Sequence, residues 1–269
     1  MMELTNSNNE KILHSFVRLL RKHKEVDPHW IIQITHDYLR RKEGKAMTDP
    51  VLLYSLEKDW YEAMRRDNVI PYHLYGDDRY IPDALSCYFI YSKKYIRQIA
   101  DRRSYKSEAL YDKIMAVKSI ADLGAGFGLT SVQLRQTFPE AGLIATNLKD
   151  TLQFRIMREL SERYGFRIES QLSGVGPVDM VFASEYFEHF REPIDHLREV
   201  IAQCSPKILF CANTFTSDAV GHFDSYLING TEYSGKDIGR IFSREMKELG
   251  YKKQDTNLWN NRPSLFMKL

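Results

Sequence analysis

The stretch Ser184-Glu185-Tyr186-Phe187-Glu188-His189-Phe190 carries three side chains that could do chemistry together. If it turns as a helix, Glu185, Glu188 and His189 share a face, because they stand at positions i, i+3 and i+4. An unperturbed imidazole has a pKa near neutrality, so His189 is the natural candidate for a general base. Two carboxylates and an imidazole are also a suitable ligand set for a divalent metal ion. A third interpretation stays open, in which the acid and the histidine only shape the loop.

A second stretch of this kind is Asp122-Leu123-Gly124-Ala125-Gly126-Phe127-Gly128, where an apolar run ends in an acid and breaks into alternating glycines. Glycine has no Cβ, so such a loop can take positive φ and bring bare backbone against a ligand. A helical pattern follows from Leu129 to Phe138 and stops at Pro139. Dinucleotide binding is disfavoured, because that fingerprint requires a glycine where Leu129 stands. An ordinary turn between two elements is the alternative.

Strand and helix patterns alternate from Ser107 onward, which is typical of an α/β domain. The first strand ends before the glycines, and Asp150 is a candidate cap for a helix that ends at Gly165. Residues 213–234 are predicted to be a loop, and Asn260-Asn261-Arg262-Pro263 a hairpin turn between the last two strands. Six further strands are expected at 141–147, 166–170, 178–184, 207–212, 251–258 and 264–269.

Residues 1–106 show no period-two alternation and are predicted to form a helical extension. Helical patterns cover 11–25, 28–41, 50–66 and a longer stretch after Pro82. The first of these is basic and amphipathic, so it could contact a phosphate-bearing partner or a membrane surface, or simply pack on the domain. Between the last two helices, residues 69–82 combine tyrosines with charged side chains and could line a substrate pocket.

Bulk composition sets limits on function. The chain has 269 residues, 43% of them apolar, and a formal charge of +2, so no global field predicts binding to nucleic acid or membranes. Cys87, Cys204 and Cys211 are an odd number without close pairs, which indicates neither a disulfide frame nor a zinc site and favours a cytoplasmic location. No run reaches the roughly 20 apolar residues of a membrane span.

The string DLGAGFG at 122–128 resembles motif I of the class I S-adenosylmethionine-dependent methyltransferases, an acid and an apolar residue followed by G-x-G-x-G. The resemblance covers roughly residues 107–269. It implies a Rossmann-like α/β fold with a seven-stranded, mostly parallel sheet, helices on both faces and a reversed last strand. The extension at 1–106 would cover the open end of the sheet and help to select the substrate.

This resemblance also implies an S-adenosylmethionine site. In the family, the methionine part of the cofactor lies near the glycine loop, and an acid after the second strand binds both ribose hydroxyls. Here Asn147 takes that place and can accept only through its amide oxygen, although Asp150 follows and could compensate. The cofactor-binding residues implied are Asp122, Gly124, Ala125, Gly126, Asn147 and Ser184.

The 184–190 stretch resembles the SE-x-x-EH motif of small-molecule methyltransferases, which makes His189, Glu188 and Glu185 the candidate catalytic residues. The same string recurs in metal-dependent relatives, the ubiquinone-pathway O-methyltransferases and the small-RNA 3′-end 2′-O-methyltransferases. The RNA enzymes add a later histidine. By this resemblance Glu185, Glu188, His189 and His222 are candidate ligands for Mg²⁺.

These observations predict a cytoplasmic S-adenosylmethionine-dependent O-methyltransferase that acts on a small-molecule or sugar-like hydroxyl. RNA 2′-O-methylation is an alternative that the basic helix at 11–25 favours and the nearly neutral chain opposes. A second alternative, suggested by Asn147, is a cofactor-binding fold that has lost catalysis and serves as a partner subunit. A nucleotide-dependent oxidoreductase is disfavoured by the glycine spacing.

Overall fold

The computed structural model describes residue 18 and residues 50–67, 69–77, 79–258 and 262–269. The predicted helices at 11–25 and 28–41 lie outside the described residues, except that Arg18 is helical and exposed. The third predicted helix is confirmed as α3 (Pro50–Asp67), which has a proline in its first turn, where no backbone N–H is needed.

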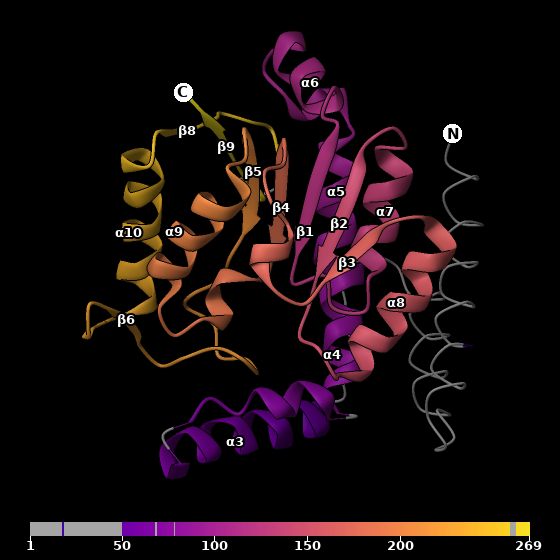
Figure 1. Ribbon diagram of the computed structural model, residues 1–269. Coiled ribbons are helices and arrows are strands. Elements are labelled where there is room, and N and C mark those ends of the chain that lie inside the picture. Colours follow the sequence, from indigo (N-terminus) through magenta and orange to yellow (C-terminus); the bar gives the residue numbers. More distant parts are fainter. Residues whose placement is uncertain (1–17, 19–49, 68, 78, 259–261) are drawn as a thin grey trace.

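Seven strands form the central sheet (Figure 1) in the order β3-β2-β1-β4-β5-β9-β8. The strands from β1 to β5 are parallel, and β9 runs antiparallel to both of its neighbours. This arrangement confirms the predicted α/β class with a mostly parallel sheet and a reversed last strand. The strand order reverses between β1 and β4, so their carboxyl ends are where a ligand is expected. The strands are β1 (Ser119–Leu123), β2 (Gly142–Thr146), β3 (Arg167–Glu169), β4 (Met180–Ser184), β5 (Ile208–Ala212), β8 (Tyr251–Lys253) and β9 (Ser264–Lys268).

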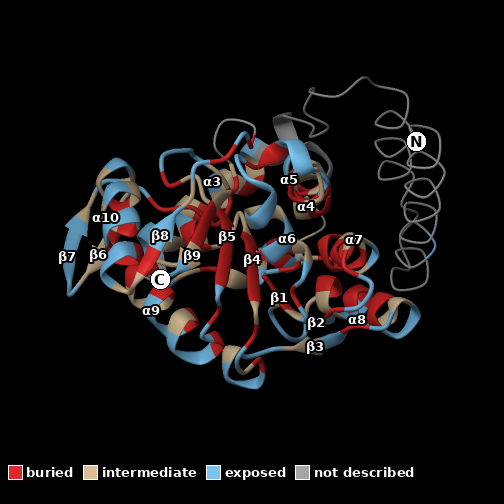
Figure 2. Ribbon diagram, turned by 90° about the horizontal axis from the view of Figure 1, so that it is seen from above, coloured by how far each residue is buried: buried red, intermediate tan, exposed pale blue. Residues whose placement is uncertain are grey.

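Helices cover both faces of the sheet (Figure 1). One face carries α5 (Lys93–Ile99), α7 (Leu129–Thr137) and α8 (Leu152–Tyr164), and the other carries α9 (Pro193–Cys204) and α10 (Gly235–Glu248). Burial on both sides explains the continuous apolar run of β4, in which 180–183 are buried (Figure 2). Among the described residues, no helix is long and apolar enough to cross a membrane.

The predicted extension shares its core with the sheet. Ile96 and Ile99 of α5 are fully buried in the same hydrophobic cluster as Ile120 of β1 and Val132 of α7. This cluster crosses the predicted boundary between 106 and 107. The division into 1–106 and 107–269 stays a prediction, and the described residues of the first part share a hydrophobic core with the second.

The long helix predicted after Pro82 begins at Tyr80 and contains a wider turn. It comprises α4 (Tyr80–Cys87), a π-helical turn (Tyr88–Ser92) and α5. π-Helical turns are rare in proteins, and those that do occur often lie at functional sites. Here Ser92, the last residue of the turn, places its Oγ 2.9 Å from the Oγ of Ser184 at the end of β4.

The predicted loop at 213–234 is wrong in part, because it contains the hairpin β6 (Tyr226–Ile228) and β7 (Thr231–Tyr233). Its turn is Asn229-Gly230, both with positive φ. Two further corrections concern element ends. β8 stops at Lys253 instead of 258. Thr151, not Asp150, caps α8, since its side chain accepts a hydrogen bond from the Phe154 N–H.

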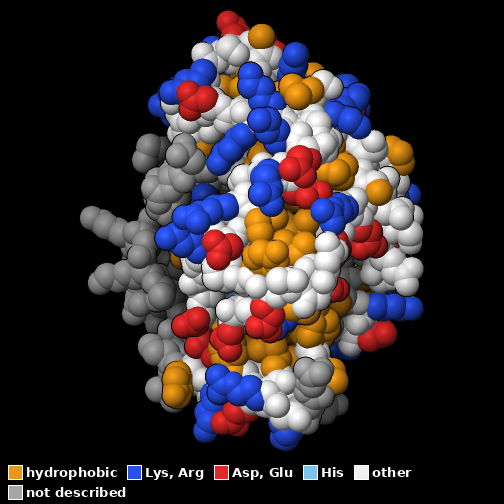
Figure 3. All heavy atoms as spheres, turned by 90° about the vertical axis from the view of Figure 1, so that its left-hand side faces the viewer, with side chains coloured by type: hydrophobic (Ala, Val, Ile, Leu, Met, Phe, Trp, Pro, Cys, Tyr) orange, Lys and Arg blue, Asp and Glu red, His pale blue; other side chains and the backbone are white. Residues whose placement is uncertain are grey.

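The surface carries both signs of charge. On the face that includes α10 (Figure 3), Lys and Arg side chains predominate in the upper half, and Asp and Glu side chains gather near the middle beside hydrophobic ones. Such a mixture is what the formal charge of +2 predicts.

Candidate active site

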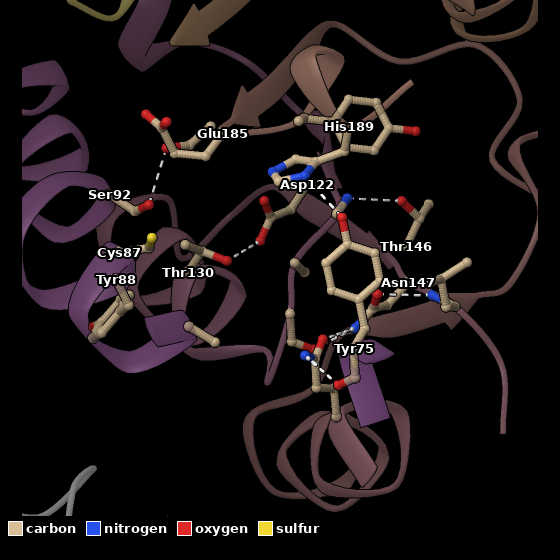
Figure 4. Close-up of a pocket in the computed structure, with 18 of the residues that line it drawn as sticks. Tyr75, Cys87, Tyr88, Ser92, Asp122, Thr130, Thr146, Asn147, Glu185 and His189 are labelled. Atoms are coloured by element: carbon tan, nitrogen blue, oxygen red, sulfur yellow. Dashed lines mark hydrogen bonds between the residues drawn. The ribbon is translucent and has the colours of Figure 1, made fainter. Parts of the chain in front are cut away.

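A cavity of about 810 Å³ lies at the carboxyl ends of β1, β2 and β4. Its walls come from the sheet loops on one side and from the segment before the sheet on the other. Figure 4 shows side chains from both parts facing one another across it. Tyr72, Tyr75 and Tyr80 line the cavity, which confirms that the 69–82 segment can contribute to a pocket wall.

The glycine loop that follows β1 forms one wall of the cavity. Gly124 and Gly126 take φ of +65° and +54°, which explains the need for glycine. The Ala125 N–H donates to the carbonyl of Thr146 over 2.9 Å, and the Gly124 N–H donates to Thr146 Oγ1 over 3.2 Å. These bonds fasten the loop to the end of β2, so its bare backbone faces the cavity in a fixed position.

Tyr186 covers Gly124 closely. A Cβ at Gly124 would lie 2.5 Å from Tyr186 Cδ2. Tyr186 has little freedom to move aside, because its hydroxyl lies 2.8 Å from His196 Nε2.

We expect Gly124→Ala to lower the free energy of unfolding by about 1–3 kcal/mol, because a non-glycine residue there is both strained and overpacked. Urea denaturation measures this loss. Gly126→Ala is the matched control, since its φ is also positive but an added Cβ would meet nothing within 4 Å. Equal losses in the two variants would show that the Tyr186 contact contributes nothing.

The Asp122 carboxylate is hydrogen-bonded to two residues at the start of α7. It is 2% exposed and accepts hydrogen bonds from Thr130 Oγ1 (2.7 Å) and Ser131 Oγ (2.6 Å). Burial raises the pKa of this carboxyl to about 6, although both hydroxyls favour its charged form. Asp122 lines the cavity (Figure 4), so it both fixes the loop and faces the proposed cofactor.

Asn147 joins the loops after β1 and β2. Its Nδ2 donates to the carbonyl of Gly126 over 2.7 Å and to Gln153 Oε1 over 3.1 Å, and its Oδ1 accepts from the Leu148 N–H over 2.7 Å. One lone pair of Oδ1 remains for a ribose hydroxyl. Asp150 is exposed and is not among the cavity-lining residues, so the suggested compensation has no structural support.

The predicted shared face of Glu185, Glu188 and His189 is wrong in its geometry. Glu185 takes φ of +51°, and only the short 3₁₀ turn Phe187–His189 follows it. Glu185 and His189 line the cavity, whereas Glu188 is completely buried behind them. Glu188 Oε1 accepts the Thr214 N–H over 2.7 Å, so this carboxyl holds the loop after β5.

Glu185 and Glu188 form a buried carboxyl pair. Their side chains are in hydrogen-bonding contact, and the amide nitrogen of Asn213, oriented toward Glu188, lies 3.2 Å from Oε2. Burial raises the pKa of Glu185 to about 7, and burial together with the Glu185 charge raises the pKa of Glu188 well above its usual range. Two carboxyls this close cannot both ionise, so they share one proton at neutral pH.

His189 holds the segment before the sheet. Its Nδ1 lies 2.8 Å from the hydroxyl of Tyr75, and its carbonyl accepts from the Tyr72 hydroxyl over 3.4 Å. Figure 4 shows Tyr75 directed at the His189 ring. Burial, with a smaller contribution from the nearby His222, lowers the pKa of His189 to about 3. His189 is therefore neutral at physiological pH and a weaker base than its usual pKa implies.

The four predicted metal ligands are not assembled. Within 50–67, 69–77, 79–258 and 262–269, no three His, Cys, Asp or Glu side chains are grouped to hold a metal ion. Glu188 faces Thr214, and His222 Nδ1 lies 2.8 Å from the carbonyl of Ser217. The carbonyl of His222 accepts from Trp60 Nε1 over 2.9 Å, which ties α3 to the site. The predicted metal set Glu185, Glu188, His189 and His222 is therefore not supported, although Glu185 contacts Glu188 and the rings of His189 and His222 have centroids 5.0 Å apart.

Asp83, Cys87 and Arg262 are among the cavity residues that were not identified from the sequence. Asp83 and Cys87 lie on α4, and Arg262 donates through Nη1 to Thr214 Oγ1 over 2.7 Å. The spacing of Asp83, Cys87 and Tyr91 at every fourth position was an available signal for the first two. Arg262 gave none, because it reaches the cavity from the far end of the chain.

No family model and no curated protein sequence matches this chain. Among solved structures, it is similar to the mitomycin 7-O-methyltransferase MmcR, with 12% identity and a TM-score of 0.51. The match covers 80% of this chain and 66% of MmcR, so this chain spans slightly less than two thirds of the length of MmcR. It is also similar to an O-methyltransferase family protein from Burkholderia thailandensis, with 12% identity and a TM-score of 0.50 over 80% of this chain and 70% of that chain. The chain therefore shares the fold of these two O-methyltransferases.

Proposed function

We propose that this protein is an S-adenosylmethionine-dependent methyltransferase that methylates a hydroxyl oxygen of a small molecule. The observation that carries the proposal is that the glycine loop after β1 and the carboxyl of Glu185 after β4 face one cavity at the switch point of the sheet. One loop supplies bare backbone for a cofactor, and the other supplies a proton acceptor.

The residues around the loop fit the proposed cofactor. Bare backbone at Gly124 and Gly126 leaves room for the methionine part, and the free lone pair of Asn147 Oδ1 can accept from a ribose hydroxyl. Ser184 Oγ is bonded to Ser92 Oγ at the edge of the same cavity. When bound, S-adenosylmethionine supplies an electrophilic methyl group on a sulfonium.

We assign the general base to Glu185 in preference to His189 or Glu188. An acceptor hydroxyl must lose its proton during transfer, and a base is most effective when its pKa lies near the working pH. The pKa of Glu185 is raised to about 7 by burial, whereas burial lowers that of His189 to about 3. Glu188 does not line the cavity, and its proposed role is to hold the shared proton so that Glu185 can ionise.

A small acceptor is favoured over RNA. The cavity volume of about 810 Å³ lies in the upper part of the range for small-ligand sites, which is roughly 300–1,000 Å³. That is room for a cofactor and a second small molecule. Tyrosines from the segment before the sheet enclose the acceptor side. The nearly neutral chain supplies little of the electrostatic attraction on which RNA binding depends.

Binding of the cofactor is the direct test. We expect S-adenosylhomocysteine at 100 times its dissociation constant to add about 2.7 kcal/mol to the free energy of unfolding. A thermal-shift titration measures this, with NAD⁺ as the matched control. A shift with NAD⁺ alone would support the oxidoreductase alternative. Binding of S-adenosylhomocysteine without methyl transfer to any hydroxyl compound would support the partner-subunit alternative.

A further inference from the structure

The charges on the cavity wall are unbalanced. Four acids line it, and Arg262 is the one Lys or Arg side chain among the described lining residues. The lining histidines do not supply further positive charge, because burial lowers the pKa of each. The four acids are Asp83, Asp122, Glu185 and Glu199.

Three of these acids already have partners. Asp122 accepts from Thr130 and Ser131, and Glu199 Oε2 lies 3.0 Å from His196 Nδ1. Glu185 shares a proton with Glu188 and is close enough to Arg262 for its pKa to be lowered by that charge. Asp83 is the exception. Its side chain is half-buried, and no cation or hydrogen-bond donor among the described residues contributes to its pKa, which burial and Glu57 raise to about 6.

Tyrosine side chains line the cavity together with Asp83. The ring centroids of Tyr75 and Tyr80 lie 4.9 Å apart, and the charge of Asp83 adds to the effect of burial in raising the pKa of both tyrosines. It also adds to the raised pKa of Tyr91, which follows on the same helical segment. The negative charge of Glu57 on α3 also acts on Asp83. A carboxylate among tyrosine faces is a favourable environment for an ammonium group, which gains both an ion pair and cation–π contacts. A neutral or anionic ligand gains neither.

We propose that the methyl acceptor carries an ammonium group in addition to its hydroxyl, and that Asp83 binds this ammonium. This inference rests on the proposed methyltransferase function. Asp83 interacts with Tyr75, Tyr80 and Cys87, whereas the glycine loop is held by Thr146 and Tyr186. Asp83 is therefore assigned to the acceptor side of the cavity, where its charge also helps to raise the pKa of Glu185.

Matched probes test the proposal with the full-length chain loaded with S-adenosylhomocysteine. Tyramine and 4-ethylphenol form one pair, and glucosamine and glucose form another; within each pair the main difference is the amine. By titration calorimetry we expect the amine of at least one pair to bind tenfold or more tightly than its neutral counterpart, the range of a charge-assisted hydrogen bond. Asp83→Asn should abolish that preference and leave the neutral probes unaffected.

Asp112→Asn on α6 (Glu108–Met115) is the control, since Asp112 is exposed and far from the cavity. Equal binding of amine and neutral probe in both pairs would overturn the proposal, as would an amine preference that survives Asp83→Asn. A tenfold loss of S-adenosylhomocysteine affinity in Asp83→Asn would also overturn it, because Asp83 would then serve the cofactor.

Two measurements separate this inference from the general function. Asn is isosteric with Asp and removes a half-buried charge that has no cationic partner among the described residues, so Asp83→Asn should melt no lower than the native chain. If S-adenosylhomocysteine does not bind at all, the methyltransferase proposal fails. The probe pairs are then measured on the ligand-free chain, where loss of the amine preference in Asp83→Asn still identifies an ammonium site.

Discussion

Replacing Glu185 by Gln should lower the rate of methyl transfer by about 10²- to 10⁴-fold, the usual contribution of a general base. Gln has the same shape but cannot take the proton of the acceptor hydroxyl. Because burial raises the pKa of Glu185 to about 7, the native rate should rise with pH up to about 7 and then level off. The residual rate of Glu185→Gln should be flat over the same range.

The measurement is the initial rate of transfer from labelled S-adenosylmethionine at several pH values, with cofactor affinity measured separately by calorimetry. Glu108→Gln on the exposed start of α6 is the control for the substitution itself. His189→Asn should keep the rising pH profile if Glu185 is the base. Unchanged turnover in Glu185→Gln, or a profile that disappears only in His189→Asn, would return the role to His189.

Acidification should destabilise the native chain relative to His189→Asn. The native-state pKa of His189 is lowered to about 3, while an unfolded histidine titrates near 6.5, so below 6.5 the unfolded chain binds the extra proton. Stability from this group is complete above pH 6.5 and is lost as pH falls toward 3, at about 1.4 kcal/mol per pH unit. Asn keeps an acceptor where Nδ1 meets the Tyr75 hydroxyl but does not titrate.

Urea denaturation of both proteins at pH 7, 6 and 5 measures this difference. The comparison with a variant is necessary, since Glu185, Asp83 and Asp122 have raised pKa values and gain protons in the native state over part of the same range, which opposes the effect. His73→Asn is the control, because His73 is exposed. A difference in unfolding free energy that does not change with pH would show that His189 titrates normally.

Much of the fold was predictable because its signals are local. The apolar run of β4 and the proline at the start of α9 each indicate one element without reference to the rest of the chain. The hairpin β6–β7 was missed although Asn229-Gly230 is a strong turn signal. Its strands have three residues each, too few for a period-two pattern to stand out.

The candidate site was predictable only in its location. Spacing alone placed Glu185, Glu188 and His189 together, but their directions are set by Thr214 and Tyr75, which are distant in the sequence. The positive φ of Glu185 is likewise imposed by its surroundings, because a local preference for that conformation belongs to Gly, Asn and Asp. Tertiary contacts therefore distinguish the proposed base, Glu185, from Glu188 and His189, which the sequence made look equivalent.

The contacts that close the cavity have a consequence for biosynthesis. Trp60 is hydrogen-bonded to His222, and Tyr75 to His189. The two partners are 162 residues apart in the first pair and 114 residues apart in the second. The ribosome synthesises Trp60 and Tyr75 long before His189 and His222, and contacts between residues so far apart in the chain form slowly. The wall of the cavity that is synthesised first can thus be fastened only after His189 and His222 have been made, and Trp60 and Tyr75 lack these partners until then.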